Sequence, residues 1–213
     1  IIEQSDVTSA MTSYNRVNIM SEAERESDPD SAYDKANDRP ASLDNYTMDV
    51  LLRATYGFDG YITSDCDSVW IAYTGRGYTQ EKGATSGNGH GWYLPAEYAE
   101  GGESRKITAL ETIAWAIAAG EDLECNAGYS GRTGSDNFEY SQLVPSAVKA
   151  GIQTEAGLFD ENTVDISLLR LLTARMELGE FDDDEGVVSW YNSAVERSEA
   201  YGEGWVYEST PNN

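Results

Sequence analysis

Residues Gly57 to Asp67 read Gly-Phe-Asp-Gly-Tyr-Ile-Thr-Ser-Asp-Cys-Asp, and this stretch decides the predicted fold. A glycine-bounded turn leads into Tyr61-Ile62-Thr63, a short run of residues that favour β-strands. Two carboxylates, Asp65 and Asp67, follow at the C-terminal end of this run. In parallel α/β folds, the loops that leave the C-terminal strand ends converge on one crevice. A carboxylate held there can act as a nucleophile, a general base or a metal ligand.

This stretch resembles the nucleophile segment of glycoside hydrolase family 3, whose pattern is Gly-Phe-x-Gly-x-Val-x-Ser-Asp. The ending Ser64-Asp65-Cys66-Asp67 is similar to the β-xylosidase branch, because the β-glucosidase branch more often reads Ser-Asp-Trp. Three further segments resemble family segments in the same order: Met11-Thr12-Ser13-Tyr14-Asn15-Arg16-Val17-Asn18, Ala119-Gly120-Glu121-Asp122-Leu123-Glu124-Cys125 and Arg170-Leu171-Leu172-Thr173-Ala174-Arg175-Met176-Glu177-Leu178-Gly179. Four segments in the family's order support the resemblance far better than any one alone.

The resemblance implies an α/β fold that is a partial TIM-type (β/α)8 barrel. A complete barrel typically needs about 250 residues, and the chain has 213. We therefore expect residues 1–181 to form the last strands and helices of the barrel, with an acidic insertion at residues 19–39. Residues 182–213 are expected to form an acidic linker with a helical or irregular tail. The chain begins at Ile1 without an initiator Met or a visible signal peptide, and we interpret it as a fragment or a processed chain.

Local patterns predict the other elements. Strands are predicted at residues 7–14 and 122–124, and helices at residues 42–56, 107–119, 142–149 and 164–178. Ser42 is expected to cap the first of these helices, and Gly57 is expected to end it. The last helix carries an apolar stripe that we interpret as core packing, formed by Ile166, Leu169, Leu172 and Met176.

A long Gly-, Ser- and Tyr-rich loop, residues 73–103, follows the Asp65 segment and holds the single histidine, His90. Three aromatic residues of this loop, Trp92, Tyr93 and Tyr98, are candidates for stacking on sugar rings. The alternative, that they pack the loop onto the barrel, stays open.

The composition is strongly acidic, with 38 Asp and Glu against 14 Lys and Arg and a formal net charge of −24. This balance argues against nucleic-acid binding, which needs a cationic surface to neutralise phosphate. It also disfavours anionic membranes and phosphorylated substrates, whereas neutral sugars are compatible with it. A salt-rich habitat and an acidic secreted hydrolase both explain the charge.

The two cysteines, Cys66 and Cys125, both follow predicted strand ends inside the family-like segments. If the barrel is present these strands are neighbours, and a disulfide is plausible provided that the Cα atoms lie within about 7 Å. A pair of reduced, buried thiols is the alternative. Structural zinc is not expected, because no CxxC or Cys/His spacing occurs.

The resemblance assigns the catalytic nucleophile to Asp65, with a carboxylate that merely caps the next helix as the alternative. It places Tyr14 beside Asp65, where a phenol would keep that carboxylate ionised and hold its rotamer. Asp67 would contact a sugar hydroxyl or act as a structural cap. The general acid/base of the family is a glutamate of the following domain, and no residue of this chain matches it.

The resulting hypothesis is a retaining exo-glycosidase that hydrolyses terminal β-D-xylosyl, or α-L-arabinofuranosyl, residues of xylan-derived oligosaccharides. A β-glucosidase and a catalytically incomplete carbohydrate-binding or scaffold fragment are the alternatives. A metal-dependent hydrolase using Asp65, Asp67 and Asp122 is disfavoured, because one loop histidine leaves few of the usual ligands. No cofactor is expected. The expected partners are a glycoside substrate, the missing barrel strands and a following α/β sandwich domain, and the expected location is extracellular.

Overall fold

The computed structural model describes residues 7–18, 38–75, 91–125, 138 and 140–181 of the chain. The chain divides into two units, residues 1–171 and residues 172–213. The described part of the second unit is the end of the last helix and the turn after it, where Arg175 pairs with Glu180. The predicted acidic tail, residues 182–213, lies outside the described residues, as does nearly all of the predicted insertion at residues 19–39.

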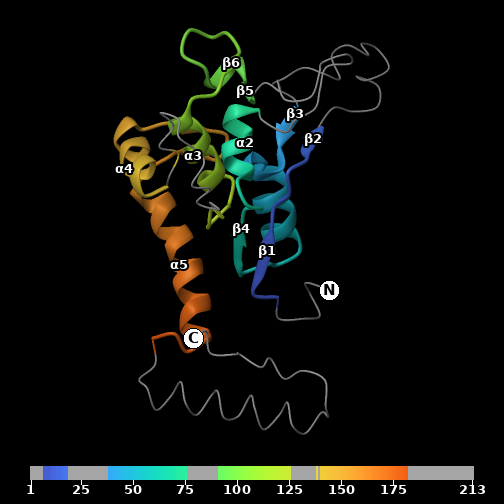
Figure 1. Cartoon of the computed structure of the whole chain (residues 1–213), viewed down its shortest axis with the longest axis vertical. Helices are drawn as coiled ribbons and strands as arrows, with labels where there is room; N and C mark the ends of the chain where they lie inside the picture. Colours follow the sequence, from blue (N-terminus) through green and yellow to red (C-terminus); the bar gives the residue numbers. More distant parts are fainter. Residues whose placement is uncertain (1–6, 19–37, 76–90, 126–137, 139, 182–213) are drawn as a thin grey trace, which may run out of the picture. The chain divides into compact units, whose positions relative to one another are not determined.

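Three chain segments lie side by side in parallel. Strand β1 (Ser9–Met11) pairs with strand β4 (Tyr61–Thr63), with Ala10 opposite Ile62. Thr63 forms a parallel bridge to Leu123, which belongs to the predicted strand at residues 122–124. Figure 1 shows β1 and β4 running together. Parallel strands joined through helices confirm an α/β fold, and within the described ranges only these three segments pair in parallel.

The connection from β1 to β4 contains a small antiparallel pair and a helix. Strand β2 (Arg16–Asn18) pairs with β3 (Asp38–Pro40), and the short 3-10 turn η3 (Ala41–Leu43) follows. The helix η4 (Tyr46–Thr55) has π-type hydrogen bonds, and Gly57 at φ 71° ends it as predicted.

The predicted cap of this helix is wrong. Ser42 is buried within η3, and the Asp44 carboxylate accepts the hydrogen bond from the Thr47 N–H at 3.1 Å instead. The short 3-10 turn separates Ser42 from the helix, so its hydroxyl is left to bond with other side chains.

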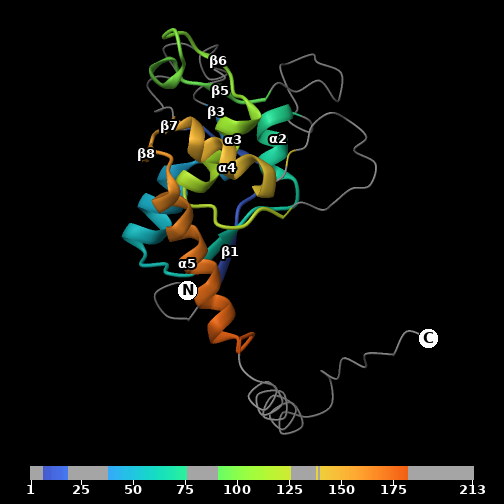
Figure 2. The ribbon, with the colours of Figure 1, turned by 90° about the vertical axis from the view of Figure 1, so that its left-hand side faces the viewer.

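The main core forms around helix α3 (Ala109–Ala118), which lies between helix α2 (Ser68–Thr74) and helix α4 (Tyr140–Ala150). Figure 2 shows α3 and α4 next to one another. The α3 segment is apolar on most faces, and residues 112–117 are all buried. A capping box between Thr108 and Glu111 begins the helix, and Gly120 follows its end at φ 109°. The predicted tight burial of this helix is confirmed.

Two aromatic residues of the long loop, Trp92 and Tyr98, pack against Trp115 of α3. Strand β5 (Tyr93–Leu94), the turn η5 (Ala96–Tyr98) and strand β6 (Arg105–Lys106) form a hairpin over α3. Trp92 is fully buried, with its ring 5.0 Å from that of Trp115, and Tyr98 packs edge-on against Trp115 at 5.1 Å. Sugar stacking is therefore wrong for Trp92, and His90 lies outside the described residues.

A second hairpin, β7 (Gln153–Thr154) with β8 (Gly157–Leu158), leads into the last helix, α5 (Glu161–Glu177). Asp160 caps this helix by accepting from the Thr163 N–H at 3.0 Å. The stripe interpreted as core packing is exposed instead, with Ile166 at 44% and Leu169 at 66% of full accessibility. Among the described helices, none is long and apolar enough to cross a membrane.

Candidate active site

The C-terminal ends of the three parallel segments bring the predicted site residues together. Asp65 follows β4, Tyr14 follows β1, and Cys125 follows the bridge at Leu123. Parallel strands put these ends on the same edge, which is where α/β enzymes form their sites.

Hydrogen bonds to two other segments hold the main chain of Asp65 on both sides. Its N–H donates to the Thr12 carbonyl at 3.1 Å, and its carbonyl accepts from the Ser68 N–H at 2.9 Å. Its carboxylate Oδ1 accepts from the Cys66 N–H at 2.7 Å, and the side chain is only partly buried. The hydrogen bonds of the main chain and of Oδ1 thus fix the direction of this carboxylate.

Tyr14 lies beside that carboxylate. Its hydroxyl donates to the Cys66 carbonyl, the residue directly after Asp65. Partial burial raises the pKa of Tyr14, and the negative charge of Asp65, a hydrogen bond with Asp65 and the charge of Asp67 raise it further. The phenol therefore stays protonated at neutral pH and can act as a hydrogen-bond donor next to Asp65.

Asp67 has an unusual backbone. Its φ of 72° is the one positive value outside glycine in the described residues. Its N–H donates to the Cys125 carbonyl at 2.8 Å, and its carbonyl accepts from the Ile71 N–H at the start of α2. Its side chain makes no capping hydrogen bond, so the alternative of a side-chain cap does not hold. Non-glycine residues in this region cost about 1–3 kcal/mol and cluster at functional sites.

Cys66 and Cys125 form a disulfide with a Cα–Cα distance of 4.4 Å, across 59 residues of sequence. The Cys125 N–H also donates to the Ser64 hydroxyl at 2.8 Å. The bond joins the end of β4 to the neighbouring segment immediately beside Asp65. It therefore fixes the spacing of the edge on which the candidate site lies.

Asp122 does not lie with the other carboxylates. It is 5% exposed, and its Oδ2 accepts from Arg53 at 2.7 Å and from the Ile62 N–H at 2.8 Å. Its Oδ1 accepts from Ser167 at 3.0 Å and from Arg170 at 3.1 Å. This carboxylate is thus a structural anchor between two guanidinium groups. The grouping of Asp122 with Asp65 and Asp67 is not formed, and the described residues hold no cluster of three His, Cys, Asp or Glu side chains arranged for a metal ion.

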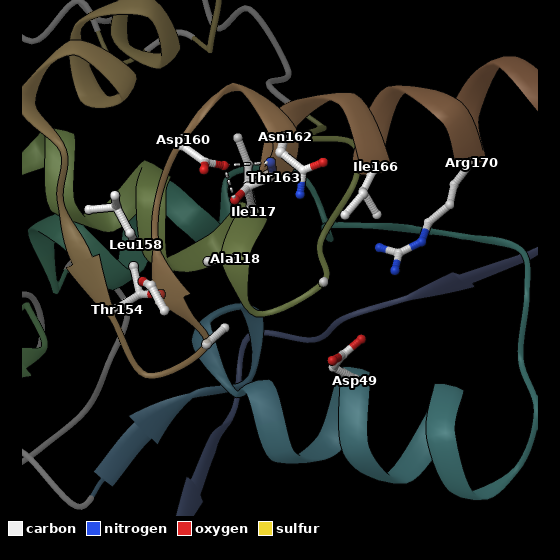
Figure 3. A pocket seen from close by; sticks show the side chains of 13 residues that line it. Asp49, Ile117, Ala118, Thr154, Leu158, Asp160, Asn162, Thr163, Ile166 and Arg170 are labelled. Carbon is white, nitrogen blue, oxygen red and sulfur yellow. Dashed lines mark hydrogen bonds between the residues drawn. The ribbon is translucent and has the colours of Figure 1, made fainter.

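A separate cavity of about 290 Å³ lies at the other end of the Gly120–Cys125 segment, between η4, the end of α3, β8 and the start of α5. Figure 3 shows Asp49 of η4 facing Ile166 and Arg170 of α5 across this space. Neither Asp65 nor Tyr14 lines it. The candidate site is therefore the strand-end edge and not this cavity.

Sequence reasoning missed the partners that fix this edge. Arg53 and Arg170 gave no local signal, because each is far from Asp122 in the chain. Glu121, which is fully buried, stood beside Asp122 in a family-like segment but had no assigned role. The available signal was a charged residue directly after the glycine that ends an apolar helix, next to Asp122.

Comparison with known proteins relates the chain to glycoside hydrolases. No family model matches the chain. An exo-1,4-β-xylosidase xlnD of Aspergillus niger is 28% identical over 140 residues, which is 62% of this chain and 14% of that protein. The probable β-D-xylosidase 6 of Arabidopsis thaliana is 30% identical over 153 residues, which is 72% of this chain and 14% of that protein.

A solved structure, the GH3 exo-β-xylosidase XlnD in complex with a xylobiose aziridine activity-based probe, is 19% identical and covers 91% of this chain and 19% of that one. Its TM-score is 0.49. The sequence matches make the chain similar to glycosidases, and within them to β-xylosidases. It spans about 14% of the length of the curated relatives named above.

Proposed function

We propose that this chain carries the nucleophile of a retaining exo-glycosidase that removes terminal β-D-xylosyl, or α-L-arabinofuranosyl, residues from xylan-derived oligosaccharides. The observation that carries the proposal is Asp65, held at the end of a parallel strand with the Tyr14 phenol beside it. The similarity to β-xylosidases supports the choice of sugar.

Retaining glycosidases use two carboxyl groups about 5 Å apart on opposite sides of the bond that breaks. In the proposed reaction, Asp65 attacks the anomeric carbon and forms a covalent glycosyl-enzyme. A general acid from outside this chain protonates the leaving oxygen and afterwards activates the water that releases the sugar. Tyr14 donates a hydrogen bond beside Asp65, and Asp67 contacts a sugar hydroxyl.

Within the described residues, the parallel sheet ends at β1. The outer edge of β1 has no partner strand within the described residues, and Met11 at its end is 65% exposed. The exposed apolar residues of α5 also leave a face that packing would cover. We therefore propose that residues 1–181 are part of a larger (β/α)8 barrel, with residues 182–213 as a linker toward a further domain. The isolated chain should show little or no turnover.

The disulfide suggests where the enzyme works. Disulfides persist in oxidising environments outside the cytosol. Because Cys66–Cys125 stabilises the edge that carries Asp65, we propose an extracellular enzyme.

The test is covalent labelling of the full natural polypeptide that carries these 213 residues. A 2-fluoro-xyloside with a good leaving group should add one sugar mass to the peptide that contains Asp65. Asp65→Asn should lower the rates of labelling and of turnover by at least about a thousandfold, because it removes the catalytic nucleophile. The matched control is Asp59→Asn, an exposed carboxylate of the turn before β4 that should react like the wild type.

The other outcomes separate the alternatives. Faster labelling by a 2-fluoro-glucoside would identify a β-glucosidase. Sugar binding without any labelling would identify a non-catalytic carbohydrate-binding scaffold. A label on a different carboxylate, or full activity of Asp65→Asn, would refute the proposed nucleophile.

A further inference from the structure

A buried carboxyl group lies directly behind the candidate site. Glu121 is 0% exposed and follows Gly120 at the end of α3, where its N–H donates to the Ala116 carbonyl at 3.1 Å. Its side chain points to the end of β1, where the Thr12 hydroxyl donates to Oε2 at 2.9 Å. Burying a charged or polar group is costly unless it is hydrogen-bonded, so a buried Glu in this place needs a reason.

Hydroxyl groups extend from Glu121 toward α2. The Thr12 hydroxyl lies 3.1 Å from that of Ser42, and the Ser42 hydroxyl lies 2.6 Å from that of Ser68. Ser42 and Ser68 are each only 1% exposed. Four side chains from four separate segments of the chain form this series, and we call them the hydroxyl relay: Glu121, Thr12, Ser42 and Ser68.

The relay ends on the residues that hold Asp65. The Thr12 carbonyl accepts the Asp65 N–H at 3.1 Å, and the Ser68 N–H donates to the Asp65 carbonyl at 2.9 Å. The Thr12 N–H also ties β1 to the Thr63 carbonyl at 2.9 Å. Both main-chain clamps on Asp65 are therefore attached, through side chains, to Glu121.

The environment favours a neutral Glu121. Burial raises the pKa of this carboxyl well above its usual value, and the charges of Glu124 and Asp122 add to that effect, while hydrogen bonds from Thr12 and Ser42 oppose it. Burial raises the pKa of the Tyr140 phenol of α4 well above its usual value, and its proximity to the carboxyl groups of Glu121, Glu124 and Asp122 adds to that effect. Thr12, directly after β1, and Ser42 of η3 bring no charge. A neutral carboxyl can both accept and donate a hydrogen bond, as a relay requires.

We propose that Glu121 is a positioning residue that sets the conformation of Asp65 through Thr12, Ser42 and Ser68. The expected effect of Glu121 on the labelling rate rests on the proposed nucleophile role of Asp65. The expected effect of Glu121 on the main chain of Asp65 does not depend on that role.

The first experiment measures the rate of labelling of Asp65 by the 2-fluoro-xyloside across pH, in the full natural polypeptide. Glu121→Gln keeps the shape and a neutral hydrogen-bonding group, so its rate at pH values below the raised pKa of Glu121 should stay near the wild-type rate. As pH rises through the raised pKa of Glu121, the wild type acquires a buried anion and its rate should fall, whereas Glu121→Gln should lack that alkaline loss. Glu121→Leu removes the relay and should label at least about tenfold more slowly, since small displacements of reacting groups are costly.

The second experiment measures exchange of single amide protons, which needs no activity. Thr12→Val and Ser42→Ala each remove one hydroxyl of the relay with little change of volume. Exchange of the Asp65 and Ser68 amides should accelerate by about tenfold or more relative to the Ile117 amide in α3, because loosened segments open more often. These variants keep the test decisive if Glu121→Leu fails to fold. Glu97→Gln, an exposed acid of η5, is the control expected to change neither readout.

The two proposals fail separately. If no label reaches Asp65 in the wild type, the glycosidase proposal fails and the exchange data alone decide the positioning role. If Asp65 is labelled, but Glu121→Gln shares the wild-type pH profile and the relay variants leave Asp65 exchange unchanged, Glu121 does not position Asp65.

Discussion

Tyr14 and Asp65 approach the same point from different strands. The phenol hydroxyl bonds to the carbonyl of the residue after Asp65, and it also interacts with the Asp65 carboxylate. Because the pKa of Tyr14 is raised, its proton remains available at the pH where a carboxylate nucleophile must be ionised. A neutral donor beside an anion stabilises that anion without forming a salt bridge that would block attack.

We predict that Tyr14→Phe lowers the rate of Asp65 labelling by about 10- to 100-fold, because one oriented donor at the reacting group is lost. The melting temperature should change little, since the Tyr14 ring is 42% exposed. Tyr46→Phe is the matched control, because that ring is 57% exposed and lies on η4. A wild-type labelling rate for Tyr14→Phe would remove Tyr14 from the mechanism.

Asp122 is the point at which several elements meet. Its two oxygens accept hydrogen bonds from Arg53 of η4, the Ile62 N–H of β4, and Ser167 and Arg170 of α5. Burial lowers the pKa of Arg53, and the negative charge of Asp122 opposes that shift. The pairing therefore keeps the buried guanidinium charged, and it orients β4, which carries Asp65.

We predict that Asp122→Asn lowers the free energy of unfolding by about 3 kcal/mol, because it leaves two guanidinium groups without their buried counter-charge. Urea denaturation of the chain measures this change, and Asp59→Asn, an exposed carboxylate, is the control. A loss below about 1 kcal/mol, typical of an exposed ion pair, would show that Asp122 is not an anchor.

The net charge of −24 is a property of the whole molecule. With 38 acidic and 14 basic residues, repulsion among surface carboxylates opposes the compact state. The ion pairs described above neutralise only a few of these charges. Dissolved salt screens such repulsion further.

We therefore predict that the melting temperature rises when sodium chloride is increased from about 0.1 M to about 1 M, since the screening length falls from about 10 Å to about 3 Å. Sucrose at matched osmolality is the control for effects that do not depend on charge. A melting temperature that stays constant or falls with salt would mean that repulsion does not limit stability.

Local sequence alone determined the parts of the molecule that need only neighbouring residues. The strand at residues 61–63, the burial of α3 and the stop at Gly57 followed from short apolar runs, side-chain periodicity and glycine, which act within a few residues. The placement of Asp65 after a strand followed in the same way. The hairpins β5–β6 and β7–β8 were not predicted, because two-residue strands carry no periodicity.

Tertiary structure decided which distant residues meet. Asp122 pairs with Arg53 across 69 residues, and Glu121 bonds Thr12 across 109 residues. Such contacts depend on how parallel segments stack, and no local pattern encodes that. The same reason explains the error at α5: helical spacing placed Ile166, Leu169, Leu172 and Met176 in one stripe, but whether such residues are covered depends on which other elements pack against them.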